Sequence, residues 1–281
     1  MKEHELIIFG GSDFEEQDAR KVAKEAGLKT ATATLDGKPV HAGNAYQATG
    51  FTMDDETSEP LSEGNKVIIF ECTPKIAENL LIVLQADHHN PGDTGYGLGA
   101  EQFWEASSLG QLCKYLGVEP TLEQLMTAAG DHCPADAYAG RCPGIDPTAF
   151  GKFRIQQKLS SPLYQRDEKK NTEEKLTDLI ESAKQQLKNA SEVEGVKDLR
   201  GTFVDELPEA GLSLGVAYMA SLLDIDRDRK PTGNTKIVLG GHTTSEAVNK
   251  FMEWANALPN KVGNAYGNPT RGFAGVVVKP E

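Results

Sequence analysis

Short apolar runs and amphipathic stretches alternate along the N-terminal part of the chain. Strand-like runs occupy residues 6–9, 29–34, 66–70 and 80–84, and turn-forming or polar residues follow each of them. Small apolar residues recur at helical spacing across residues 13–26, which predicts a helix there. Because alternating strands and helices are typical of a parallel sheet with helices packed on both faces, we expect an α/β fold.

The C-terminal part mixes helices and strands in the same way. Residues 171–190 carry one apolar face at helical spacing. Further segments are predicted as a helix at 211–223, a strand at 235–239, a helix at 245–258 and a final strand at 275–279. A second, smaller α/β domain is therefore expected.

A charged and turn-rich zone separates these two parts. We expect a first domain at residues 1–160, a helical linker at 161–195 and a C-terminal domain at 196–281. No internal repeat is visible.

Composition narrows the classes of partner. The chain has 281 residues, 38% of them hydrophobic, which is enough for a core in one large or two ordinary domains. The net charge of −13 argues against binding of long duplex DNA, because a phosphate backbone requires several basic contacts. No apolar stretch approaches the roughly 18–20 residues that span a bilayer, and no signal peptide is visible, so no membrane association is expected. Four scattered cysteines favour a cytoplasmic protein with reduced thiols.

Potential metal ligands follow the predicted strands. Asp87, His88 and His89 come just after the fourth run, and Glu71 directly follows the third. Asp131 ends a later apolar stretch. Imidazoles and carboxylates are common metal ligands, and the carboxyl ends of neighbouring parallel strands meet at one edge of a sheet. The sequence therefore predicts a metal site at that edge.

Asp13 and Glu15, just past the first strand, are candidates for the same site, since both offer oxygen ligands. An alternative role is local, because Ser12 and Glu15 have the spacing of a capping box for the predicted helix at 13–26. Both interpretations stay open at this point.

The order of these features resembles the DHH phosphoesterase family. The segments that carry the resemblance are Asp87-His88-His89, Ala106-Ser107-Ser108 at a helix start, Asp131 after a further helix, and the glycine-rich stretch 267–275. Membership would imply a manganese-dependent site at the strand ends of an N-terminal α/β domain. It would also imply a smaller C-terminal domain that closes over the substrate.

Two motifs of that family are rewritten in this chain. The family's opening Asp-x-Asp pattern is replaced by residues 10–16, where Asp13 and Glu15 would have to stand in. Glu71 occupies the place of an Asp that bridges two metal ions, and its longer side chain favours a one-metal site or a changed chemistry. The glycine-rich stretch lacks the usual His, and Arg271 is its best cation for clamping a phosphate.

The resemblance and the residue chemistry together assign the site. Metal ligation is expected of His88, Asp131, Glu71, Asp87, Asp13 and Glu15, with Asp87 either ligating or orienting an imidazole. Catalytic roles are expected of His89 and Asp87, and substrate contacts of Ser107, Ser108, His242, Arg271 and Gly272.

Some of these residues have a structural alternative. Ser107 and Ser108 either donate to a phosphate at a helix N-terminus or cap that helix. His242 either contacts phosphate or is structural, and His132 either adds a ligand or acid function or bonds the backbone. Cys133 and Cys142 are expected as thiols, with a zinc site as the alternative.

The expected function is metal-dependent hydrolysis of a phosphoester. The substrate would be a nucleotide, a short single-stranded nucleic acid or another small phosphorylated molecule, and the cofactor Mn2+ or Mg2+, with Zn2+ as a third choice. The alternative is a catalytically degenerate protein that binds a nucleotide or a protein partner without hydrolysis. The sequence does not fix the oligomeric state.

Overall fold

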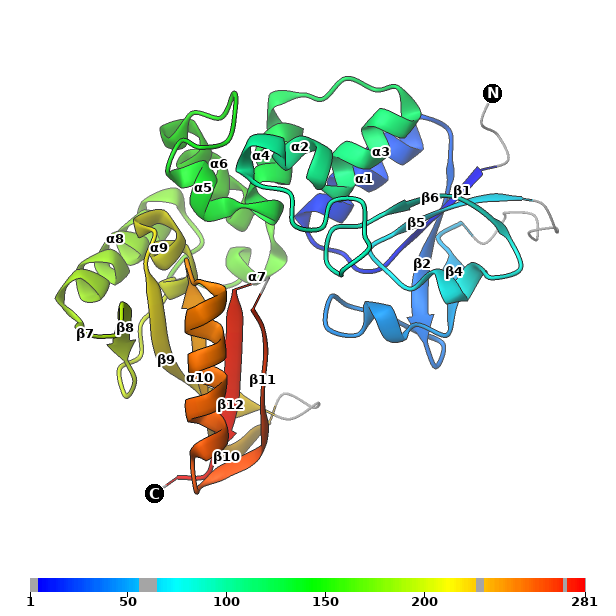
Figure 1. The fold of residues 1–281 in the computed structure, drawn as a ribbon. Coiled ribbons are helices and arrows are strands. Elements are labelled where there is room, and N and C mark those ends of the chain that lie inside the picture. The colour runs from blue at the N-terminus through cyan, green and yellow to red at the C-terminus, as the bar shows by residue number, and fades with distance from the viewer. Residues whose placement is uncertain (1–4, 56–64, 226–229, 270–271, 281) are drawn as a thin grey trace. The chain divides into compact units, whose positions relative to one another are not determined.

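Contacts within the chain divide it into two compact units. The computed structural model describes residues 5–55, 65–225, 230–269 and 272–280. The first unit comprises Met1–Cys133 and Arg141–Ile145, and the second comprises Pro134–Gly140 and Asp146–Glu281. Each contains a sheet and helices (Figure 1), which confirms the expected α/β class. The domain ranges expected from the sequence stay a prediction.

The first unit is built around a sheet with a parallel centre. Its strands are β1 (Glu5–Phe9), β2 (Lys29–Leu35), β3 (Lys38–Pro39), β4 (Gly50–Met53), β5 (Lys66–Phe70) and β6 (Leu81–Ala86). Their order is β3-β2-β1-β5-β6, with β4 also paired to β2. The pairs of β1 with β2, β1 with β5 and β5 with β6 are parallel, whereas β3 and β4 run antiparallel to β2. The carboxyl ends of β1, β5 and β6 therefore lie side by side.

Helices cover one face of this sheet. Helices α1 (Phe14–Glu25) and α3 (Ser108–Leu116) pack on it, and the buried side chains of Ile7, Phe9 and Phe70 face them. The opposite face is covered by the hairpin region after β2 and by the short helices η1 (Ala45–Gln47) and η2 (Pro74–Ala77). The expectation of α-helices on both faces is wrong, because short antiparallel strands, and no α-helix among the described residues, lie between β2 and β5.

Local signals start and stop the helices that surround the site. A capping box joins Asp13 and Glu16 at the start of α1, one residue later than the Ser12–Glu15 pair expected from the sequence. Ser107 caps α3, and Gly117, in the left-handed conformation, ends it. The remaining helices of this unit are η3 (Ala100–Gln102), α2 (Phe103–Ala106) and α4 (Leu122–His132).

The second unit has its own sheet, in the order β11-β12-β10-β9-β8-β7. Its strands are β7 (Ser191–Val193), β8 (Val196–Leu199), β9 (Ala217–Ile225), β10 (Pro231–Gly241), β11 (Lys261–Asn268) and β12 (Phe273–Val278). Its helices are α5 (Pro134–Tyr138), α6 (Pro147–Ser160), α7 (Pro162–Gln165), α8 (Glu173–Asn189), α9 (Leu207–Leu214) and α10 (Ser245–Ala257). Helix α10 packs on one face through Val248 and Phe251, and α8 and α9 pack on the other through Leu187 and Ala210.

The predicted helix at 211–223 is wrong in its second half. Helix α9 ends at Leu214 because Gly215 takes the left-handed conformation, with φ +65°, and strand β9 begins at Ala217. Tyr218 and Ala220 then face the α8–α9 side of the sheet, with the period of two that a strand requires. Within the described part of the chain, no helix is both long and apolar enough to cross a membrane.

Candidate metal centre

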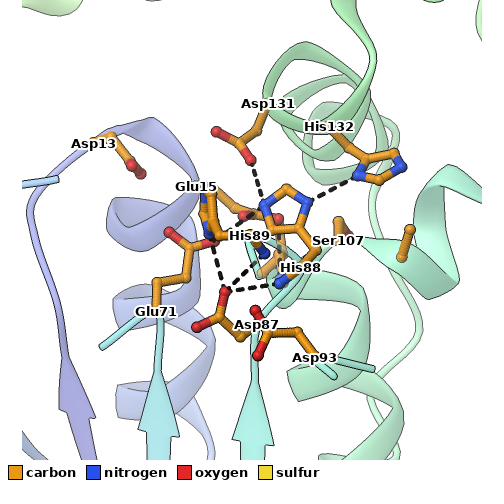
Figure 2. Close-up of polar contacts among 12 residues, drawn as sticks. Asp13, Glu15, Glu71, Asp87, His88, His89, Asp93, Ser107, Asp131 and His132 are labelled. Carbon is orange, nitrogen blue, oxygen red and sulfur yellow. Dashed lines mark hydrogen bonds and ion pairs between the residues drawn. The ribbon is translucent and has the colours of Figure 1, made fainter. Parts of the chain in front are cut away.

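Four side chains from distant parts of the first unit converge beside the carboxyl ends of its parallel strands. Glu71 follows β5, His88 and His89 follow β6, and Asp131 lies in the last turn of α4. Each offers one ligand atom, and these atoms all lie within 4.8 Å of one another. Figure 2 shows the carboxylates and imidazoles directed toward a common point. A group of this composition could hold a divalent metal ion.

Glu71 is held in an unusual backbone conformation at this point. Its φ is +51°, in the left-handed region that residues other than glycine rarely adopt. Its N–H donates to the carbonyl of Ala86 at 3.1 Å. Gly10 packs so closely against this residue that a Cβ added to Gly10 would lie 2.0 Å from the backbone carbonyl oxygen of Glu71. Backbone strain of this kind costs about 1–3 kcal/mol and is concentrated at functional sites. The fold therefore forces the Glu71 carboxylate into the cluster.

His88 lies at the centre of the group. Its Nε2 is 3.0 Å from Asp131 Oδ2 and 3.4 Å from Glu71 Oε1. Those distances suit ion pairs, yet neither His88 Nε2 nor Glu71 Oε1 has a hydrogen-bond partner of good geometry among the described residues. Buried polar atoms normally find such partners. Polar atoms that approach this closely without a well-directed hydrogen bond suit a shared cation.

Asp87 orients His88 and His89 through hydrogen bonds. It is fully buried, and its Oδ1 accepts the backbone N–H of His88 at 2.8 Å and that of His89 at 3.1 Å. The Nδ1–H of His89 donates to the same oxygen at 3.0 Å, and the hydroxyl of Tyr46 donates to both oxygens, at 3.0 and 2.9 Å. Burial alone would raise the pKa of Asp87, but the bonds from His89 and Tyr46 outweigh it and lower that pKa. These contacts are those of an orienting carboxylate, and Asp87 is not among the four clustered residues.

Asp13 and Glu15 lie beside the cluster but are already engaged. Asp13 Oδ1 accepts the N–H of Glu16 at 3.0 Å as the cap of α1, and Glu15 Oε1 accepts the N–H of Leu109 at 3.0 Å. Burial, and then the charges of Asp131 and Glu71, raise the pKa of Asp13 to about 7. The same causes raise the pKa of Glu15 well above its ordinary value. Both residues hold structural bonds, and their raised pKa values mean that the site disfavours further negative charge on them.

The electrostatics of this region favour positive charge. Burial would lower the pKa of His88, but the carboxylates of Asp131 and Glu71 raise it to about 10. Burial, followed by Asp13 and Glu71, raises the pKa of Glu16 to about 9. Since buried carboxylates are costly without a counter-charge, the region holds protons tightly. The donor set and its field therefore fit a divalent cation.

Two of the predicted substrate contacts, Ser107 and Ser108, belong to the first unit. Ser107 accepts the N–H of Gly110 at 3.0 Å and donates to the Trp104 carbonyl at 3.1 Å, as a cap does. Ser108 is fully buried beside it, and its hydroxyl has no partner in the parts of the chain that are described. Because Glu15 occupies the Leu109 amide, it lies where an anion would otherwise bind this helix N-terminus.

The other predicted substrate contacts belong to the second unit. The N–H of His242 donates to the Val216 carbonyl at 3.0 Å. Thr243 donates through its hydroxyl to the carbonyl of Gly272 at 2.6 Å, which joins the His242 turn to the glycine-rich segment. Arg271 lies outside the described residues.

Cys133 and Cys142 come close together in the first unit. Their sulfur atoms are 3.2 Å apart. Among the residues that the structure describes, no further His, Cys or acidic side chain joins them in a group able to hold a metal. The arrangement gives no support to the zinc alternative.

Tyr46 and Gln111 have roles that sequence reasoning missed. Gln111 accepts the Asp87 N–H at 3.3 Å and donates to the carbonyls of Asp87 and Ala106 at 3.0 and 2.9 Å. A polar residue between Leu109 and Leu112 on an otherwise apolar helix face was the available signal for Gln111. Tyr46 lies in the short helix η1, far in sequence from any motif, and nothing in the sequence marked it.

Comparison with known proteins assigns this chain no function. No family model matches the chain, and no curated protein matches it. A crystal structure of the exonuclease RecJ bound to manganese is similar over 99% of this chain and 86% of its own, at 11% identity and a TM-score of 0.37. That likeness is too distant to assign residues, so the functional interpretation depends on the site itself.

Proposed function

We propose that this protein is a metal-dependent phosphoesterase. The observation that supports this most strongly is the meeting of Glu71, His88, His89 and Asp131, whose ligand atoms lie within 4.8 Å of one another. Two of the converging atoms, Glu71 Oε1 and His88 Nε2, are buried and lack hydrogen-bond partners among the described residues. A divalent cation would satisfy both.

The ion is held in this proposal by Glu71, His88 and Asp131. Two carboxylates and an imidazole suit Mn2+, while Mg2+ prefers oxygen ligands and Zn2+ favours sites richer in nitrogen and sulfur. We propose one ion, because the ligand atoms that lie within 4.8 Å of one another form a single group, to which Asp13 and Glu15 do not belong. When bound, such an ion lowers the pKa of water and neutralises charge that grows on phosphoryl oxygens.

His89 is the proposed general base. Its Nδ1–H donates to Asp87 at 3.0 Å, so the lone pair of the neutral ring is on Nε2. Tyr46 and the two backbone N–H groups hold the Asp87 carboxylate in turn. Asp87 thereby fixes both the tautomer and the orientation of His89, which can accept a proton at Nε2.

The proposed substrate is a small phosphorylated molecule, such as a nucleotide or a short single-stranded nucleic acid. With a net charge of −13, the chain offers no general attraction to long nucleic acids, so a compact phosphate held by local charge is favoured. The buried Ser108 hydroxyl is a donor at the α3 N-terminus. We keep Ser107, His242, Arg271 and Gly272 as proposed substrate contacts.

Binding without hydrolysis is the second candidate function. The observation that favours it is the structural use of Asp13 and Glu15, which leaves fewer carboxylates for catalysis. Calorimetry with Mn2+ and nucleotides, followed by product analysis, separates the two. Tight nucleotide binding with no product formed would favour this candidate.

The test of the first candidate is a phosphoester panel assayed with Mn2+, Mg2+ and Zn2+. We expect His88→Ala and Asp131→Ala to lower manganese-stimulated phosphate release at least about a hundred-fold, because each removes a ligand worth several kcal/mol. His41→Ala, on an exposed loop of the same unit, is the matched control and should be unchanged. Unaltered turnover in either site variant would reject the assignment.

A further inference from the structure

We propose that His132 is a positioning residue that selects the tautomer of His88. The inference rests on the proposed metal centre, because its consequence is that His88 presents an unprotonated Nε2 to the ion. His132 lies between His88 and the carbonyl of Leu98, and all three belong to the first unit.

The proton positions follow from the hydrogen-bond partners. His132 Nε2 is 2.9 Å from the Leu98 carbonyl oxygen, and a carbonyl can only accept, so this nitrogen carries a proton. In a neutral ring the other nitrogen, Nδ1, is then an acceptor. It lies 2.8 Å from His88 Nδ1, which must therefore be the donor.

The neutral state of His132 follows from its surroundings. The ring is partly buried, and its nitrogens contact the Leu98 carbonyl and His88, whereas the carboxylates of Asp131 and Glu71 face His88 Nε2. An ion held at His88 would repel a positive charge on His132, whose ring centroid lies 5.0 Å from that of His88. Both rings cannot donate across the single Nδ1–Nδ1 contact.

The tautomer of His88 is thereby set. With its Nδ1 proton committed to His132, His88 has its remaining nitrogen, Nε2, directed at Asp131 and Glu71. Metal-binding imidazoles commonly donate their other N–H to a fixed acceptor, which also holds the ring plane. His132 performs that role here, and it is not itself a ligand because both of its nitrogens are engaged.

The Leu98 carbonyl is held in place by a close-packed loop. Gly95 donates its N–H to the Asp87 carbonyl at 3.1 Å and accepts from the N–H of Leu98 at 3.4 Å. A Cβ at Gly95 would lie 1.9 Å from the Ala106 oxygen and 2.7 Å from the Cβ of His88, so only glycine fits. The loop after the histidines thus fixes the acceptor that orients His132.

The tautomer can be observed directly by nuclear magnetic resonance. In protein labelled with 15N on histidine, an N–H···N bond gives a 15N–15N coupling between His88 Nδ1 and His132 Nδ1. We expect this coupling in metal-free and Mg2+-loaded protein, with the proton on His88 Nδ1 in both. A proton on His132 Nδ1, or no coupling, overturns the inference.

Variants of His132 supply the second arm. His132→Leu removes the acceptor at similar size, and we expect its dissociation constant for Mn2+ to rise about 10–100-fold. His132→Asn places a carbonyl oxygen near the position of Nδ1 and should recover most of the affinity. Folding of both is checked by circular dichroism and by the dispersion of their amide spectra. Equal Mn2+ affinity in a folded His132→Leu protein overturns the inference.

The two arms separate this inference from the proposed function. If the wild-type protein binds no Mn2+, the metal centre fails, while the proton position in metal-free protein still decides the role of His132. If the wild type binds Mn2+ and His132→Asn binds no better than His132→Leu, the metal centre stands and the acceptor role is rejected.

Discussion

Glu71 shows at the scale of one residue how the fold and the site compete. Its backbone is left-handed, with φ +51°, and its buried carboxylate lies near those of Asp131 and Glu15. The left-handed backbone and the buried, closely spaced carboxylates both oppose folding. Both also place a Glu71 oxygen atom in the cluster. A residue with these features is better explained by ligand binding than by stability.

Glu71→Asn should separate the two effects. Asparagine tolerates the left-handed region and removes a buried acid, so we expect the metal-free variant to match or exceed the wild-type unfolding free energy, by up to about 1 kcal/mol. Its Mn2+ affinity should fall at least about ten-fold. Urea unfolding and metal titration measure both. Asp36→Asn, at an exposed position with φ +52°, is the control that relieves similar strain outside the site. Wild-type Mn2+ affinity in Glu71→Asn would contradict the account.

Tyr46 supports the site through one hydroxyl. Tyr46→Phe removes the donor to both oxygens of the buried Asp87, and a hydrogen bond to a charged group contributes about 1.5–3 kcal/mol. We therefore expect the unfolding free energy to fall by about 2 kcal/mol and turnover to fall with it, because His89 loses part of its support. Tyr266→Phe, whose hydroxyl has no described hydrogen bond, is the control. A change no larger than that of the control would argue against this role.

At the scale of elements, a buried ionic network joins the helices of the second unit. Glu209 of α9 accepts from Arg154 of α6 at 3.1 and 3.0 Å and from the Tyr138 hydroxyl of α5 at 2.6 Å. Burial would raise the pKa of Glu209, but Arg154 and then Lys158 lower it from 4.5 to about 2. The ionised carboxylate is thus part of what holds α5, α6 and α9 together.

This network predicts a pH dependence of stability. Because the folded pKa of Glu209 is depressed, its contribution is fully present above pH 4.5 and is lost as the pH falls toward 2. The shift corresponds to about 3 kcal/mol. The difference in unfolding free energy between wild type and Glu209→Gln should therefore shrink across that window. Unfolding is followed through Trp254 in a Trp104→Phe background, since the chain has two tryptophans. A difference that is independent of pH would contradict the assigned cause.

The sequence predicts those helices and strands that local residues determine, and it fails for those that depend on tertiary contacts. The parallel strands and α1 were predictable, because apolar period and local caps determine them. The start of β9 was not predictable, since a glycine at position 215 is compatible with either the interior or the end of a helix. The packing of Tyr218 and Ala220 on α8 and α9 determines that the chain continues as a strand. In the first unit, η1 and η2 cover the face of the sheet opposite α1 and α3, and this arrangement likewise depends on tertiary packing.

The same limit applies to the site. Strand ends and motif order brought Glu71, His88 and Asp131 into one hypothesis, and the structure places them within 4.8 Å of one another, together with His89. The engagement of Asp13 and Glu15 with backbone amides could not be foreseen, because the partner of Glu15 is 94 residues away. The bond of Tyr46 to Asp87 spans 41 residues and is equally invisible to local reasoning.

At the scale of the whole molecule, the proposed ion should stabilise one unit and not the other. A ligand at 100 times its dissociation constant adds about 2.7 kcal/mol to the state that binds it. Trp104 lies in the first unit and Trp254 in the second, so single-tryptophan variants report on each. We expect Mn2+ to shift the Trp104 transition by this amount and EDTA to reverse it. A shift of the Trp254 transition without a shift of the Trp104 transition would contradict binding in the first unit.

The central claim is that Glu71, His88 and Asp131 share one divalent ion. Anomalous diffraction from crystals grown with Mn2+, recorded above the manganese absorption edge, tests it most directly. We expect a single strong peak bounded by those three side chains and no such peak in His88→Ala crystals. A peak elsewhere in the molecule, or none in the wild type at saturating Mn2+, would contradict it.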